Sequence, residues 1–126
     1  MKKILIVEDN EKNMKLVRDI LRHQGCETIE AVNGLEGARL AEEQRPDLVL
    51  MDIQLPDIDG MEALRQIRAD RSLDAVPVLA VSASVMPDDQ QKIISSGFDA
   101  FITKPINLKQ FVETVQRFLQ NGRARR

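Results

Sequence analysis

The sequence has little cysteine and few aromatic residues: Cys26 is its one Cys, there are four Phe, and there is neither Trp nor Tyr. A single Cys cannot form an internal disulfide, and it excludes a zinc site built from several thiolates. So few aromatic rings argue against a surface that stacks nucleic-acid bases. The formal net charge of −2 gives no reason to bind nucleic acid or an anionic membrane. We therefore expect neither class of partner.

Long apolar runs are also missing, so the chain has no candidate for a membrane-spanning helix. The first residues, MKKILIVEDN, reach acidic side chains too early for a secretory signal peptide. Gly and Pro are scattered singly and mark no linker, and 126 residues are enough for one hydrophobic core. These features predict a single cytoplasmic domain.

Four short apolar runs, each followed by a polar or charged residue, are typical of strands that are buried on both faces. They cover residues 4–7, 48–51, 78–81 and 100–102. A fifth segment, 26–31, is more polar and is typical of an edge strand. The sequence therefore predicts a sheet of five strands.

Apolar residues recur at helical spacing between these runs. One helix is expected between the cap Asn10 and Gly25, and another between Pro87 and Gly97. The last helix should begin after Asn107 and end near residue 121. Two further stripes lie at Leu35, Ala38 and Ala41, and at Met61, Leu64 and Ile67.

Strands that alternate with helices predict a parallel sheet, because right-handed crossovers place the helices on its two faces. Five such units favour an α/β, flavodoxin-like (βα)5 sandwich with strand order 2-1-3-4-5. In that topology ligands bind at the carboxyl ends of the strands, where the strand order reverses. Five chemically active side chains should meet there: Glu8, Asp9, Asp52, Ser82 and Lys104.

Three carboxylates gathered at one rim repel one another, by about 4 kcal/mol for each close pair at an effective dielectric near 20. A hard divalent cation relieves this repulsion, and Mg²⁺ suits oxygen ligands that include only a few carboxylates. Its two charges and that of Lys104 would balance the three acids. Asp52 could then act as the nucleophile of a phosphoryl transfer, with Ser82 donating to a phosphoryl oxygen.

The segments LIVEDN, LVLMDIQLPDIDG, PVLAVSA and FITKPI lie in order at four predicted strand ends. Together they resemble the receiver domain of bacterial two-component response regulators of the chemotaxis-regulator type. The resemblance runs from about residue 3 to residue 119. It implies a receiver domain over residues 1–121 and a short basic tail over 122–126.

The resemblance also implies roles for the residues that match its motifs. Asp52 is the phosphoacceptor. Asp9, Asp52 and the main-chain carbonyl of Gln54 hold Mg²⁺, with Glu8 helping through bound water. Lys104 contacts the phosphoryl group and precedes a cis proline.

Two further residues match the family's conformational switch. Ser82 is the switch hydroxyl, which moves toward the phosphate, and Phe101 occupies the companion aromatic position. The chain departs from the commoner pattern at three positions, with Ser for Thr, Phe for Tyr and Glu8 for Asp. The loss of the tyrosine hydroxyl puts any output contact through that oxygen in doubt. Without the resemblance, Ser82 would be a turn residue and Phe101 a core residue.

The implied function is that of a single-domain response regulator, a signalling protein that catalyses only its own phosphorylation and dephosphorylation. Phosphate would come from a sensor histidine kinase or a histidine phosphotransfer protein that docks near Asn13, Leu16, Pro105 and Ile106. It would switch a surface that binds a downstream protein, or pass along a phosphorelay. His23 is too far along its helix to be the donor. We expect a monomer or a weak dimer.

Three other functions stay open at this point. A receiver fold can serve as an adaptor that is never phosphorylated. A flavin mononucleotide binder could share the topology, but its loop after the first strand should be rich in Ser, Thr and Gly, where this chain has EDNEKN. A magnesium phosphohydrolase usually carries a second acid two residues after its nucleophile, and Gln54 stands there.

Overall fold

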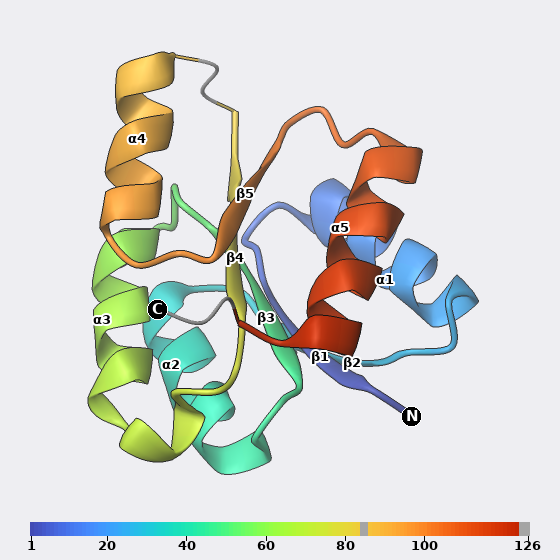
Figure 1. The fold of residues 1–126 in the computed structure, drawn as a ribbon, viewed down its shortest axis with the longest axis horizontal. Helices are drawn as coiled ribbons and strands as arrows, with labels where there is room; N and C mark the ends of the chain where they lie inside the picture. The colour runs from blue at the N-terminus through green and yellow to red at the C-terminus, as the bar shows by residue number, and fades with distance from the viewer. Residues whose placement is uncertain (84–85, 124–126) are drawn as a thin grey trace.

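The computed structural model describes residues 1–83 and 86–123. Strands and helices alternate along the chain (Figure 1), as the hydrophobic pattern predicts. The elements are β1 (Lys3–Val7), α1 (Glu11–His23), β2 (Glu27–Ala31), α2 (Gly34–Gln44), β3 (Leu48–Asp52), α3 (Gly60–Ala69), the short 3₁₀ helix η1 (Arg71–Leu73), β4 (Val78–Ser82), α4 (Pro87–Ser95), β5 (Ala100–Thr103) and α5 (Leu108–Asn121).

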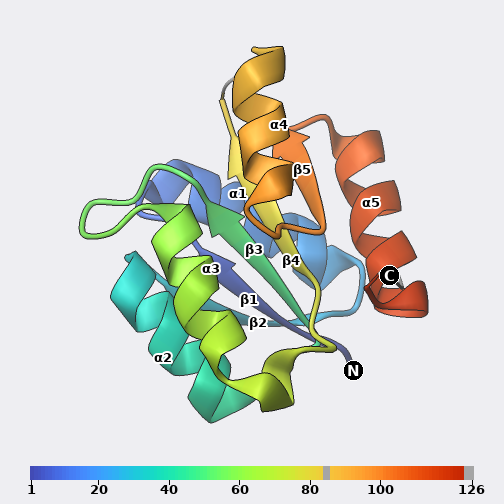
Figure 2. The same ribbon diagram turned by 60° about the vertical axis from the view of Figure 1, so that its left-hand side comes forward.

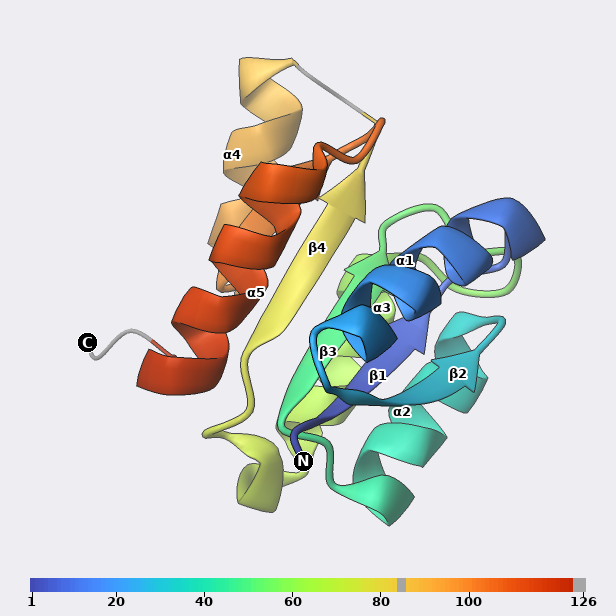
Figure 3. The ribbon, with the colours of Figure 1, turned by 90° about the vertical axis from the view of Figure 1, so that its right-hand side faces the viewer.

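The five strands form one parallel sheet in the order β2-β1-β3-β4-β5, which confirms the predicted topology. The more polar β2 lies at an edge, as its composition indicates. Figure 3 shows β2, β1, β3 and β4 side by side, with α1 and α5 on the face toward the viewer. Because Val7 pairs with Met51, and Ser82 with Thr103, the strands end close to the same rim of the sheet.

Two hydrophobic clusters fill the space on the two faces of the sheet. One packs α1 and α5 against the sheet, with Met14, Val17 and Phe111 among its buried residues. The other packs α2, α3 and α4, with Leu64 and Ile93 among its members. The molecule is therefore a three-layer sandwich, with the sheet between two layers of helices (Figure 2).

Side-chain caps fix where the helices begin. The side chains of Asn10, Asn33, Asp59 and Asn107 each accept a hydrogen bond from the backbone N–H three residues on, at the starts of α1, α2, α3 and α5. Two of these caps, Asn10 and Asn107, were predicted, and their positions are confirmed. The cap at Asn10 matters most for function, because it places α1 directly after the acidic pair that follows β1.

The predicted stripe of α2 is wrong at its first residue. Leu35 is 52% exposed, and the buried positions are Gly34, Gly37 and Ala41. A Cβ on Gly37 would lie 2.7 Å from Cγ2 of Val7, so α2 approaches β1 more closely than a side chain allows. The core face of α2 is therefore set by glycine.

The predicted tail of residues 122–126 falls partly outside the described residues, which end at 123. Arg123 itself is held in place: its Nε donates to Asp99 at 2.9 Å and its Nη1 to the carbonyl of Asp74 at 2.7 Å. Among the residues that the structure describes, none of the helices has both the length and the apolar character to span a membrane.

Candidate functional site

The carboxyl ends of four strands bring the predicted site residues to one rim. Glu8 and Asp9 follow β1, Asp52 ends β3, Ser82 ends β4 and Lys104 follows β5. Backbone bonds extend the pairing past the strands, from Glu8 N–H to the Ala31 carbonyl at 3.0 Å and from Lys104 N–H to the Ser82 carbonyl at 2.8 Å. The side chains are thus placed by the sheet itself.

Three carboxylates form a cluster at this rim. Glu8, Asp9 and Asp52 each offer an oxygen, and these three oxygens lie within 4.8 Å of one another. Glu8 and Asp52 are buried, with 4% and 5% of their surface exposed, whereas Asp9 is exposed. The cluster is therefore open to solvent on the side of Asp9 and enclosed on the side of the sheet.

Lys104 is the cation that faces the two buried acids. Its Nζ lies 2.9 Å from Oδ2 of Asp52 and 3.2 Å from Oε1 of Glu8. Burial acts to lower the pKa of Lys104, but the hydrogen bonds and charges of Asp52 and Glu8 outweigh it and raise that pKa. Lys104 is therefore protonated and positively charged at neutral pH. Its bond to Pro105 is cis, as the resemblance implied.

The surroundings of Glu8 disfavour its ionised form. Burial, and after it the neighbouring Asp52, raise the pKa of Glu8 to about 7, against the opposing effects of the Asn10 N–H and of Lys104. The Asn10 N–H donates to Oε2 of Glu8 at 3.2 Å. One lysine therefore does not fully balance the negative charge that the strands gather here.

The loop after β3 holds Asp52 in position. The N–H of Gln54 donates to Oδ1 of Asp52 at 2.9 Å, so one carboxylate oxygen faces the loop and the other faces Lys104. Gly60 N–H closes the base of the loop on the carbonyl of Ile53 at 2.9 Å. A Cβ on Gly60 would lie 2.7 Å from the carbonyl oxygen of Asp52, and this close approach calls for glycine.

Two cavities open onto Asp52. One, of about 400 Å³, lies on the acidic side and is lined by Glu8, Asp9, Asn13, Gln54 and Lys104 among others. The second, of about 250 Å³, extends from Asp52 past Ser82 and Ala83 toward α4. The carboxylate of Asp52 can thus be reached from the acidic side and from the side of α4.

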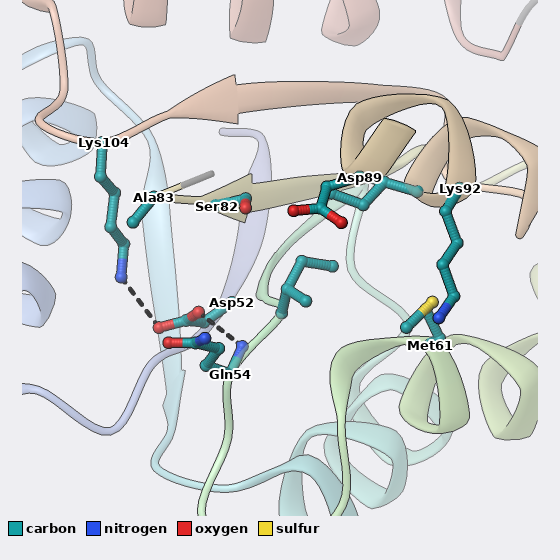
Figure 4. A pocket seen from close by; sticks show the side chains of 10 residues that line it. Asp52, Gln54, Met61, Ser82, Ala83, Asp89, Lys92 and Lys104 are labelled. Carbon is teal, nitrogen blue, oxygen red and sulfur yellow. Dashed lines mark hydrogen bonds and ion pairs between the residues drawn. The ribbon is translucent and has the colours of Figure 1, made fainter. Parts of the chain in front are cut away.

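The second cavity has lining residues that sequence reasoning missed, namely Met61, Asp89, Lys92 and Ile93. In Figure 4, Lys104 points toward Asp52, while Asp89 and Lys92 come from α4 on the other side of the cavity. The spacing of Asp89, Lys92 and Ile93 puts them on one face of a helix that begins shortly after β4. This spacing is the sequence feature from which they could have been predicted to face the site.

A family model for the response regulator receiver domain matches residues 4–116. The chain belongs to the response regulator receiver family.

Response regulators of Brucella species are among its similar relatives. The polar-differentiation response regulator DivK of Brucella anthropi is 48% identical over 118 residues, which are 94% of this chain and 96% of that protein. DivK of Brucella ovis is 47% identical over the same shares. This receiver chain is thus similar to DivK along nearly its whole length.

Solved receiver structures are similar in fold. The receiver domain of the sensor histidine kinase PA1611 from Pseudomonas aeruginosa, whose structure has a magnesium ion coordinated in the active site cleft, has a TM-score of 0.89 and 32% identity, covering 95% of this chain and 98% of that one. The chemotaxis response regulator CheY4 of Vibrio cholerae has a TM-score of 0.88 and 26% identity, covering 93% and 98%. The flavodoxin-like fold of this receiver is thus that of CheY-like proteins.

The other residues implied by the resemblance are distributed as follows. Phe101 is partly buried and packs against the cluster of α2, α3 and α4. In the receiver's predicted docking surface, Leu16 is 45% exposed, Pro105 is exposed and Asn13 lines the acidic cavity. Ile106 instead packs partly against the cluster of α1 and α5.

The alternatives to a response regulator are not favoured. The loop after β1 presents Glu8 and Asp9, which would repel the phosphate of a flavin. Gln54 stands where a phosphohydrolase of this kind carries its second acid.

His23 ends α1, about 20 Å along a helix of this length from the end that faces the site.

Proposed function

We propose that this receiver accepts a phosphoryl group on Asp52, with Mg²⁺ as cofactor, and so acts in phosphorylation-dependent signalling. The observation that carries the proposal is the convergence of oxygens from Glu8, Asp9 and Asp52 to within 4.8 Å, beside the amine of Lys104. Acidic side chains at buried strand ends are costly unless their charge is compensated, so this arrangement favours a cationic ligand.

The donor set fits magnesium. Carboxylate and carbonyl oxygens are its preferred ligands, and it keeps several waters, so few protein ligands are needed. We assign direct ligation to Asp9, Asp52 and the main-chain carbonyl of Gln54, and an indirect role through water to Glu8. When bound, the ion would neutralise charge on the phosphoryl oxygens.

The chain's own residues supply the rest of the transfer. A carboxylate oxygen of Asp52 forms a bond to phosphorus as the bond from phosphorus to the donor's imidazole nitrogen breaks, and the electron pair of that bond stays with the ring. The ammonium group of Lys104 balances charge on the transferring oxygens. The hydroxyl of Ser82, which lines the cavity above Asp52, donates to one of them.

Phosphorylation would then alter a surface. We assign Ser82 and Phe101 to the switch, with output through α4, β5 and α5. The phosphodonor would be a histidine kinase or phosphotransfer protein that docks around Asn13, Leu16, Pro105 and Ile106, and a downstream protein would read the altered surface. We also propose that the receiver acts in the cytoplasm as a monomer or weak dimer, and that its partners are proteins, with no nucleic acid and no membrane among them.

Incubation with acetyl phosphate and Mg²⁺, followed by intact-mass measurement, tests the proposal. The wild-type protein should gain the mass of one phosphoryl group, and Asp52→Asn should gain none. Asp47→Asn is a matched control, because Asp47 is an exposed carboxylate at the opposite end of the same strand, and it should be modified like the wild type. Chelation of Mg²⁺ should prevent the reaction. An unmodified wild type, or a modified Asp52→Asn, would overturn the assignment.

A further inference from the structure

The start of α2 is capped by a residue from a different loop. The first two N–H groups of the helix, on Gly34 and Leu35, donate to Oδ1 and Oδ2 of Asp57 at 2.8 and 2.9 Å. The third, on Glu36, donates to Asn33 at 2.8 Å. The first turn of a helix has no partners for these groups within the helix. Asp57 therefore caps α2 with both of its carboxylate oxygens, although it lies 22 residues after Leu35 in the sequence.

Asp57 belongs to the loop that forms one wall of the acidic cavity. This loop, residues 53–59, runs from Asp52 to the start of α3, and Gln54, Leu55 and Pro56 line the cavity beside Glu8 and Asp9. In Figure 2 it extends beyond the strand ends between β3 and α3. The loop is closed at its base by the bond from Gly60 N–H to the Ile53 carbonyl. Leu55 and Ile58 pack against the cluster of α2, α3 and α4, and Asp57 adds hydrogen bonds to this attachment.

The contact with α2 is tight as well as polar. A Cβ on Gly34 would lie 2.5 Å from Cγ1 of Ile58, so the loop lies directly against the helix start. Desolvation acts to raise the pKa of Asp57, but the bonds from Leu35 and Gly34 N–H outweigh it and lower that pKa. The carboxylate is thus ionised at neutral pH and suited to the positive end of the helix dipole.

We propose that Asp57 is a positioning residue for the cation site: by fastening the 53–59 loop to α2, it sets the place of the Gln54 carbonyl. The inference rests on the proposed function, because it requires Mg²⁺ to bind at the acidic cluster. Asp57 itself touches neither the cation nor the phosphoryl group. Only Leu55 and Pro56 separate it from Gln54, so fixing Asp57 limits how far the Gln54 carbonyl can move.

Calorimetric titration with Mg²⁺ tests this. Asp57→Ala should bind Mg²⁺ about tenfold more weakly than the wild type, at the lower end of what groups that hold metal ligands in place contribute. Asp57→Asn keeps an acceptor oxygen for one N–H and should lie between the two. The matched control is Asn33→Ala, which removes another cap of the same helix but leaves the loop attached, and its Mg²⁺ affinity should be that of the wild type.

Thermal unfolding in EDTA, followed by circular dichroism, separates positioning from folding. Asp57→Ala and Asn33→Ala should both lower the unfolding temperature, and only Asp57→Ala should lose Mg²⁺ affinity. Equal affinity in Asp57→Ala and the wild type would overturn the inference and leave the proposed function intact. An equal loss in Asn33→Ala would also overturn it, because the effect would then come from α2 alone. A wild type that binds no Mg²⁺ would overturn both proposals.

Discussion

Buried carboxylates occur at both ends of the sheet, but the two ends neutralise them differently. At the amino end, Asp99, with 4% of its side chain exposed, accepts bonds from Arg68 at 3.2 Å, Arg123 at 2.9 Å and Val78 N–H at 2.8 Å. At the carboxyl end, Glu8 and Asp52 share the amine of Lys104. One acid has two guanidinium groups, whereas two buried acids and the nearby Asp9 have one ammonium group.

The amino end is a structural ion-pair cluster, whereas the carboxyl end is a site that can accept a ligand. At the amino end the charges of Arg68 and Arg123 are balanced by Asp99 and the nearby Asp74, and the Asp99 carboxylate is occupied by bonds from the chain. The acidic rim has a surplus of negative charge and a cavity beside it. A cation can lower the energy of the second arrangement but not that of the first.

The largest effect is expected when the amino-end ion pairs of Asp99 with Arg68 and Arg123 are broken. Asp99→Ala leaves Arg68 and Arg123 without their shared acceptor and should destabilise the fold by about 3 to 5 kcal/mol, the range for breaking a buried ion pair. Urea unfolding monitored by circular dichroism measures this. Mg²⁺ should stabilise the variant by as much as it stabilises the wild type. A loss of the Mg²⁺ response would show that the two ends of the sheet are not independent.

A pH-dependent effect comes next and concerns Glu8. Its pKa is about 7 in the folded protein and 4.5 in an unfolded chain. As pH rises through this interval, the unfolded chain releases its proton first, so the metal-free fold loses stability, by at most about 3 kcal/mol. The loss is absent below the lower pKa and complete above the higher one.

Urea unfolding in EDTA across this pH interval tests that sign. Other acids also titrate here, so the quantity of interest is the difference between the wild type and Glu8→Gln, which has no proton to lose at this position. The stability of the wild type relative to Glu8→Gln should fall as pH rises. A difference that does not change with pH would mean that Glu8 ionises normally in the fold.

The smallest expected effect is at Asp9. Asp9→Ala removes repulsion from Glu8 and Asp52, and without Mg²⁺ it should raise stability by up to about 1 kcal/mol, because functional sites hold charge at a cost in stability. It should also remove the stabilisation by added Mg²⁺. Glu11→Ala, which removes an exposed acid of the first turn of α1, is the control and should keep the Mg²⁺ response. A loss of several kcal/mol in metal-free Asp9→Ala would instead make Asp9 a structural residue.

The sequence was sufficient for the sheet and for the main site residues, because both follow from local pattern. Apolar runs that end in Asp52 or Ser82 identify buried strands and the residues at their ends. Alternation with helices then fixes a parallel topology, which collects the strand ends at one rim. The convergence of Glu8, Asp9 and Asp52 follows from these two steps.

Features that depend on contact between distant segments were not predictable in this way. Nothing local to Asp57 indicates that it caps α2, and nothing near residue 123 indicates a partner at Asp99. The predicted stripe of α2 is wrong at Leu35, because glycine contributes no hydrophobic signal although Gly34 and Gly37 are the buried positions there. In each case the decisive quantity is how closely two elements approach, which periodicity does not encode.

The most direct test of the central claim is the ³¹P NMR spectrum of the protein incubated with acetyl phosphate and Mg²⁺. An acidic rim that accepts a cation and a phosphoryl group predicts one new protein-bound acyl phosphate signal, absent from Asp52→Asn and from samples without Mg²⁺. A signal that persists in Asp52→Asn, or a wild-type spectrum with no such signal, would contradict the account.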